Sequence, residues 1–184
     1  MLFRKPRGIR GKNNEQRKIV VVVDLENMIA NTELPPGADF TLNQALADLM
    51  QKLANMGDIV GKFVFTPPHR IPAFEKFFSE HRFFIIACPK AQTAEGTKDT
   101  TDQTIMDFCR QVAAEIPGIT HFCLCSGDAD FIPMIEILKK KGMKIIIASG
   151  NLRALAGDLI RLAEPNESGG RRVFILSPST SRAT

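Results

Sequence analysis

The sequence predicts a three-layer α/β/α domain built around a mainly parallel sheet. Short apolar runs rich in β-branched residues alternate along the chain with longer segments whose apolar residues recur at helical spacing. This alternation is typical of a parallel sheet covered by helices on both faces. The 184 residues suffice for one such domain, which we expect at 18–176, with a basic arm at 1–17 and a tail at 177–184.

The first expected strand is the run IVVVV at residues 19–23, whose side chains suit a central strand buried on both faces. Further strands are expected at residues 59–65, 83–87, 121–125, 143–148 and 171–176. Helices are expected from an N-cap at Thr41 to a stop near Gly57, and at residues 71–80, 101–115, 131–141 and 151–164. Loops rich in polar residues, Pro or Gly are expected at residues 32–39 and 89–100.

Residues 121–150 form the unit around which the chain is organised. An apolar run is followed by the acidic break SGDAD, a helical pattern that stops at Gly142, and a second apolar run. This order predicts a right-handed crossover between two parallel strands. Ligands of such sheets bind beyond the carboxyl ends of the strands, so Asp128 and Asp130 lie where a functional site is expected.

The net charge of +4 is modest, but basic residues concentrate near the amino terminus. The first eighteen residues contain one acid, Glu15, and the cations Arg4, Lys5, Arg7, Arg10, Lys12, Arg17 and Lys18. Such an arm packs no core, so we expect it to be mobile. It either contacts a phosphate backbone or aids solubility, and the sequence leaves both roles open.

No apolar run is long enough for a membrane span or a signal peptide, so we expect a cytoplasmic protein with no membrane partner. The four cysteines fit this location. They lack a CxxC spacing or a spaced His pair, so small core residues are expected rather than zinc ligands. Trp and Tyr are absent, and aromatic stacking on RNA would therefore rest on Phe or His.

Acidic residues follow several of the expected strands. Asp24 ends the first strand, and Asp128 and Asp130 follow the fourth. Asp102 lies in the first turn of the helix after the third strand, on the face that also carries the apolar residues of that helix, which places it at the inner edge of the sheet. Asp107 lies ~140° further round the helix and is a weaker candidate.

Carboxylates that converge in a partly dry pocket repel one another, and either proton uptake or a bound cation relieves the repulsion. Ligand sets made of oxygen alone suit Mg²⁺ or Mn²⁺ better than zinc. A hard cation held in this way can polarise a phosphate oxygen and activate a water. The acids therefore point to hydrolysis of a phosphodiester.

Each candidate also has a purely structural interpretation. Asp24 could cap the turn after its strand, Asp130 could be the N-cap of a helix that begins at Phe131, and Asp102 could interact with the helix dipole. Asn27 and Ser126 could only hold turns, and Asp107 and Lys98 could be solvated. The coincidence of acids at strand ends carries the argument for a site.

Two segments resemble the NYN domain, a branch of the PIN-like nucleases that includes the LabA-like bacterial proteins. They are VVVDLENM at 21–28 and SGDADFIPMIEILKKKGMKI at 126–145. Asp24 and Asn27 match the family's Asp-x-x-Asn, and its Ser-x-Asp-x-Asp-Phe is matched in full. Lys98 and Asp102 fill the place of a Lys and an Asp that opens a helix, with an insertion of about one residue relative to the commoner spacing. Asp107 stands where the family often has a second Asp. The resemblance spans about residues 18–164.

The resemblance implies a PIN-like, Rossmann-like fold and a ribonuclease that hydrolyses RNA phosphodiester bonds. Asp24, Asp102, Asp128 and Asp130 would be catalytic and would hold one or two Mg²⁺ or Mn²⁺ ions. Asn27 and Ser126 would orient ligands or the scissile phosphate, and Lys98 and the basic arm would contact the RNA. The expected partner is single-stranded RNA, and a homodimer remains open.

Two other functions compete with this hypothesis. A haloacid-dehalogenase-type phosphatase also begins with an Asp after an apolar strand, but its nucleophile motif is Asp-x-Asp, and Glu26 stands at the second position here. A non-catalytic module of the same fold would bind RNA or a protein, with the acids as relics or caps. The complete set of acids favours the nuclease over the module.

Overall fold

The computed structural model describes residues 16–31, 38–93, 96–98, 100–153 and 155–176. Its centre is a six-stranded sheet in the order β3-β2-β1-β6-β7-β8, in which all neighbouring strands are parallel. The strands are β1 (Lys18–Asp24), β2 (Asp58–Thr66), β3 (Phe84–Ala87), β6 (His121–Cys125), β7 (Lys144–Ser149) and β8 (Val173–Ile175). The predicted parallel α/β sheet is therefore confirmed.

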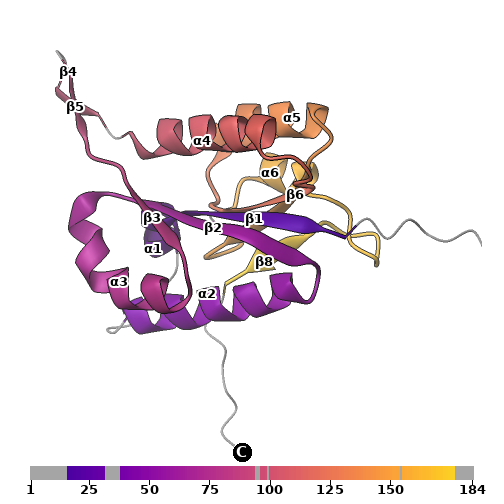
Figure 1. Ribbon diagram of the computed structural model, residues 1–184, viewed down its shortest axis with the longest axis horizontal. Helices are drawn as coiled ribbons and strands as arrows, with labels where there is room; N and C mark the ends of the chain where they lie inside the picture. Colours follow the sequence, from indigo (N-terminus) through magenta and orange to yellow (C-terminus); the bar gives the residue numbers. More distant parts are fainter. Residues whose placement is uncertain (1–15, 32–37, 94–95, 99, 154, 177–184) are drawn as a thin grey trace, which may run out of the picture.

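Helices cover both faces of the sheet (Figure 1). One face carries α1 (Leu25–Asn31), α2 (Ala38–Ala54) and α3 (Ile71–Glu80), and the other carries α4 (Thr101–Glu115), α5 (Ile132–Lys140) and α6 (Gly157–Leu162). The strand order reverses between β1 and β6, because the chain builds β2 and β3 on one side of β1 and β6 to β8 on the other. Ligands of open α/β sheets bind at the carboxyl ends of strands at such a switch point.

The alternation of side chains along β1 creates the two cores. Ile19, Val21 and Val23 pack into the cluster formed with α1, α2 and α3, whereas Val20 and Val22 pack into the cluster with α4, α5 and α6. None of the five is more than 2% exposed. A strand buried on both faces has no polar side, which explains the unbroken apolar run in the sequence.

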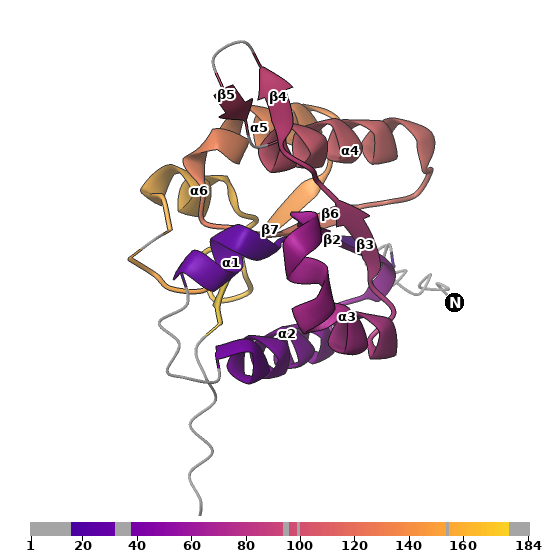
Figure 2. The ribbon, with the colours of Figure 1, turned by 90° about the vertical axis from the view of Figure 1, so that its left-hand side faces the viewer.

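Three elements differ from the sequence-based expectation. Helix α1 follows β1 without a loop, and it buries only Leu25 and Met28, too few residues to show a helical period. The expected loop at 89–100 contains an antiparallel hairpin of β4 (Ala91–Thr93) and β5 (Gly96–Lys98), which projects from the body of the domain (Figure 2). Helix α2 begins at Ala38, so Thr41 lies inside it and is not its N-cap.

The expected helix at 151–164 is also shorter, because a turn occupies its first residues. The side-chain oxygen of Asn151 accepts a hydrogen bond from Arg153 N at 2.6 Å, and Ser149 Oγ donates to the Asn151 carbonyl at 3.1 Å. These bonds offer the backbone an alternative to helix. Helix α6 therefore starts only at Gly157.

Other expectations concern the ends of the chain, the cysteines and the membrane. The basic arm, apart from residues 16–17, and the tail at 177–184 lie outside the described residues. The four cysteines are free and buried, as expected of core residues. Among the described residues, no helix is long and apolar enough to cross a membrane.

A buried ionic cluster lies where β6 begins. Glu164 Oε2 is 3.3 Å from His121 Nε2, and Glu164 Oε1 is 2.6 Å from Arg172 Nε. The three side chains are 7%, 1% and 14% exposed, in the order Glu164, His121, Arg172. Burial acts to raise the pKa of Glu164, but the contact with His121 and the charges of His121 and Arg172 outweigh it, so the pKa is lowered.

Candidate metal centre

The candidate site lies at the switch point between β1 and β6. The register pairs Val23 with Cys125, so Asp24 and Ser126 are the next residues on the two neighbouring strands. Ser126 Oγ donates a hydrogen bond to Asp24 Oδ2 at 3.3 Å, and both side chains are buried. The pairing of the strands thus brings these two predicted site residues into contact.

Asn27 connects the first turn of α1 to the turn after β6. Its backbone N–H donates to Asp24 Oδ1 at 3.2 Å, and its side-chain oxygen accepts from Gly127 N at 3.0 Å. Because Asn27 lies three residues after Asp24, its backbone N–H is one of the unpaired donors in the first turn of α1 and can reach the Asp24 carboxylate, while its side chain reaches Gly127. Asn27 therefore holds the two motifs of the chain together.

The acidic turn after β6 is organised by Asp128. Its side chain accepts from Asp130 N at 3.0 Å and caps the 3₁₀ turn Ala129–Phe131. Its backbone N–H donates to Ser126 Oγ at 3.3 Å. The interpretation of Asp130 as the N-cap of the following helix is wrong: α5 begins at Ile132, and Phe131 stands at its N-cap position.

Three of the predicted acids converge. One carboxylate oxygen each from Asp102, Asp128 and Asp130 lies within 4.8 Å of the other two. Two oxygens on opposite sides of one Mg²⁺ are about 4.2 Å apart, since each lies at about 2.1 Å from the ion. The separation and the purely carboxylate donor set therefore fit a hard divalent cation.

Asp24 lies beside this trio and is 4% exposed. Burial raises the pKa of Asp24 from its ordinary value of 3.8 to about 7, and the charges of Asp102 and Asp128 act in the same direction. The hydrogen bonds from Asn27 and Ser126 oppose the rise without cancelling it. Four acids from three separate segments thus share one electrostatic environment at the carboxyl edge of the sheet.

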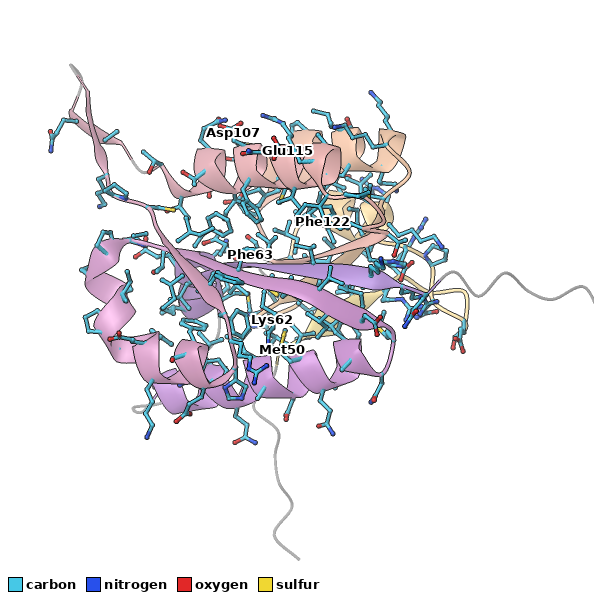
Figure 3. The ribbon with its side chains drawn as sticks, viewed as in Figure 1. Met50, Lys62, Phe63, Asp107, Glu115 and Phe122 are labelled. Carbon is cyan, nitrogen blue, oxygen red and sulfur yellow. The ribbon has the colours of Figure 1, made fainter. Side chains whose placement is uncertain are left out.

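Two other predicted residues stand apart from the cluster. Asp107 lies on the side of α4 that faces away from the sheet (Figure 3), where its side chain is 61% exposed. It accepts hydrogen bonds from Gln103 at 2.8 Å and Arg110 at 3.0 Å, as a solvated helix residue would. The backbone of Lys98 belongs to β5, and its side chain lies outside the described structure.

A cavity of about 340 Å³ opens next to the acids. Its lining includes Asn27 and Asp128 on one side and Arg153, Leu155 and Ala156 on the other. The sequence predicts a helix from residue 151 and suggests no role for Arg153. Its position just after a buried strand was the available signal, because β7 lies next to β6 and loops that follow neighbouring parallel strands meet at one edge.

Glu26 does not take part in this site. Its carboxylate lies 3.5 Å from the Arg70 side chain and 4.0 Å from His69. In a haloacid-dehalogenase-type phosphatase, the second position of the Asp-x-Asp motif would lie beside the first acid. The pairing of Glu26 with Arg70 therefore argues against that alternative.

Fold and site together define an α/β domain with an acid-lined ligand site at its switch point. The family model for the NYN domain matches residues 18–164. The chain belongs to the NYN domain family, whose members are generally PIN-like nucleases.

Among solved structures, the chain resembles a protein of unknown function from Vibrio parahaemolyticus. The two share 19% sequence identity with a TM-score of 0.62, and the match covers 89% of this chain and 94% of that one. At this identity the likeness bears on the fold alone. A comparison with curated proteins finds no match.

Proposed function

We propose that this protein is a ribonuclease that hydrolyses phosphodiester bonds of single-stranded RNA with Mg²⁺ or Mn²⁺. The observation that carries the proposal is the convergence of Asp102, Asp128 and Asp130 within 4.8 Å at the switch point of the sheet. Membership of the NYN domain family supports it. Asp24, Asp102, Asp128 and Asp130 are the proposed catalytic residues and cation ligands.

The acids and their neighbours have separate tasks in this proposal. Asp102, Asp128 and Asp130 hold the cation, and the buried Asp24 adds a further carboxylate as it loses its proton. A bound divalent ion supplies Lewis-acid polarisation of a phosphate oxygen and lowers the pKa of a water. Ser126 fixes the orientation of Asp24 through its hydroxyl.

Asn27 and Lys98 are the proposed contacts with the RNA. Asn27 lines the cavity beside Asp128, and its amide group can donate a hydrogen bond to a phosphate oxygen. Lys98 lies on β5, two residues before Thr100, which is the N-cap of the helix α4 that carries Asp102. A lysine there would pair with the RNA backbone as a point charge.

The test is cleavage of a labelled single-stranded RNA in Mn²⁺ and in EDTA. We expect the wild type to cleave the RNA in Mn²⁺ but not in EDTA. In Asp24→Asn and Asp128→Asn the cleavage rate in Mn²⁺ should fall by about 10²-fold or more, as for removal of a group that stabilises charge in a transition state. Asp107→Asn is the matched control, since Asp107 lies outside the cluster. Equal cleavage by all four proteins would reveal a contaminant.

Calorimetry, together with the cleavage assay, separates the nuclease from a non-catalytic module. Calorimetry should show Mn²⁺ binding to the wild type that is lost in Asp128→Asn. Binding of RNA without cleavage, and without any Mn²⁺ binding that depends on Asp128, would favour a binding module instead.

A further inference from the structure

We propose that Arg153 binds a phosphate group of the RNA strand next to the cleaved bond, within the cavity beside Asp128. The inference rests on the proposed function for the identity of the ligand. Its basis is the placement, the charge and the surroundings of Arg153.

The loop that carries Arg153 is attached to the acidic turn. Ala156 N donates a hydrogen bond to the Gly127 carbonyl at 3.3 Å, and Gly127 N donates to Asn27 at 3.0 Å. These bonds join the loop after β7 to the turn after β6 and to α1. The loop that carries Arg153 is therefore attached next to Asp128, and both residues line the cavity.

The loop is also fixed from within. Ser149, which is fully buried, donates to the Asn151 carbonyl, and the Asn151 side chain accepts from Arg153 N. The backbone N–H of Arg153 is thus held by the turn that precedes it. A side chain on such a backbone loses less freedom on binding than one on an unsupported loop.

The charge of Arg153 is uncompensated within the described chain. Two other arginines near the surface pair with acids, Arg161 with Asp158 and Arg110 with Asp107, whereas the exposed Arg82 and Arg171 form no salt bridge among the described residues. None of the salt bridges among the described residues involves Arg153, although it lies on the same cavity as Asp128. Its planar fork of donors matches a phosphate, and among the described residues that line this cavity it is the only basic one.

The cavity is suited to one nucleotide. Its volume of about 340 Å³ lies near the lower end of the range for small-ligand sites, about 300–1,000 Å³. The apolar part of the cavity wall consists of Ala129, Leu155 and Ala156. Its polar groups come from Asn27, Asp128 and Arg153. Arg153 and Asp128 line the same open cavity, so a strand with one phosphate at Arg153 can present a neighbouring phosphodiester to Asp128.

Fluorescence anisotropy with a labelled single-stranded RNA tests the inference without cleavage, in EDTA and again in Ca²⁺. We expect Arg153→Ala to weaken binding about tenfold, as for loss of one charge-assisted contact. The slope of log K against log salt should fall by about 0.7, the value for one phosphate contact on a single strand. Arg153→Lys should keep the slope but recover only part of the affinity.

Arg161→Ala is the matched control, because Arg161 is exposed on α6 and already paired, and it should leave both the affinity and the slope at wild-type values. Wild-type affinity and slope in Arg153→Ala would overturn the inference, as would a wild type that binds no RNA. RNA binding that depends on Arg153, with no Mn²⁺-dependent cleavage, would overturn the proposed function and leave the phosphate site in place.

Discussion

Asn27 and Gly127 lie 100 positions apart in the sequence and are joined by a hydrogen bond of 3.0 Å from the Gly127 N–H to the Asn27 side-chain oxygen. The bond locks the end of the β1 motif to the turn that carries Asp128. It also satisfies a backbone donor at the buried Gly127. The Asn is therefore a structural connection as well as a candidate RNA contact.

Replacement of this Asn should destabilise the fold. In Asn27→Ala the Gly127 N–H loses its partner in a buried position, which costs about 1–3 kcal/mol. Urea unfolding measures the change. Gln103→Ala removes an exposed hydrogen bond to Asp107 and should change the free energy of unfolding by less than about 0.5 kcal/mol. Equal effects of the two substitutions would contradict this account.

The stability of the cation-free protein should depend on pH through Asp24. The folded state holds the Asp24 proton up to about pH 7, whereas the unfolded chain releases it near 3.8. The folded state binds more protons in this interval, so the free energy of unfolding falls as pH rises through it, by on the order of 4 kcal/mol at most.

Comparison with Asp24→Asn isolates that contribution. The variant should be more stable than the wild type above pH 7 in EDTA, and the difference should shrink and vanish toward pH 4. Urea unfolding at a series of pH values gives both curves. A constant difference between the two proteins across this range would rule out a raised pKa at Asp24.

Mn²⁺ should stabilise the wild-type protein but not variants in which an acid of the cluster is replaced. A ligand that binds only the folded state adds about 2.7 kcal/mol at a hundredfold excess over its Kd. Thermal unfolding at pH 7.5 should therefore show a higher Tm with Mn²⁺, and Asp128→Asn should lose this rise. Asp107→Asn should keep it, since that residue is exposed and paired on the outer side of α4.

The ionic cluster at the opposite end of β6 should affect stability but not RNA cleavage. Glu164→Gln leaves His121 and Arg172 without their carboxylate partner, which should cost about 3–5 kcal/mol. The pKa of Glu164 is lower in the folded protein than in the unfolded chain, so the ionised Glu164 stabilises the folded state. This stabilisation is complete above the ordinary pKa of a Glu side chain and is lost as the pH falls through the pKa of Glu164 in the folded state. The difference between wild type and Glu164→Gln should thus decrease in acid.

Cleavage by Glu164→Gln, measured well below its Tm, should match the wild type. His121 begins β6 and Ser126 follows its end, so the two groups are separated by the length of that strand, about 17 Å. A large loss of activity in a folded Glu164→Gln protein would show that the two ends of the sheet are coupled.

The sequence was sufficient to predict the sheet and the acids at its edge. The run at 19–23 is typical of a strand buried on both faces, and parallel strands place their carboxyl ends together, so the sequence predicts that Asp24 and Asp128 lie at the same edge of the sheet. Asp102 followed from the apolar face of α4, which includes the buried Ile105 and Cys109.

Other features depend on contacts that a local pattern does not contain. The strands of the β4–β5 hairpin are three residues long and largely polar, so they show no alternation. The sequence suggests Asp130 as an N-cap because it directly precedes the helical pattern, but in the structure it is the Asp128 carboxylate that accepts a hydrogen bond from a backbone N–H, that of Asp130. The cavity beside Arg153 depends on the order of β6 and β7 in the sheet, which the sequence does not specify.

The acids of the cluster come from three segments that are far apart along the chain: the end of β1, the start of α4 and the turn after β6. A nascent polypeptide can complete this cluster only once Asp130 has left the ribosome and β6 has paired with β1. A product that ends before Asp128 carries only Asp24 and Asp102 of these four acids. A fragment that lacks the turn after β6 therefore cannot assemble the cluster.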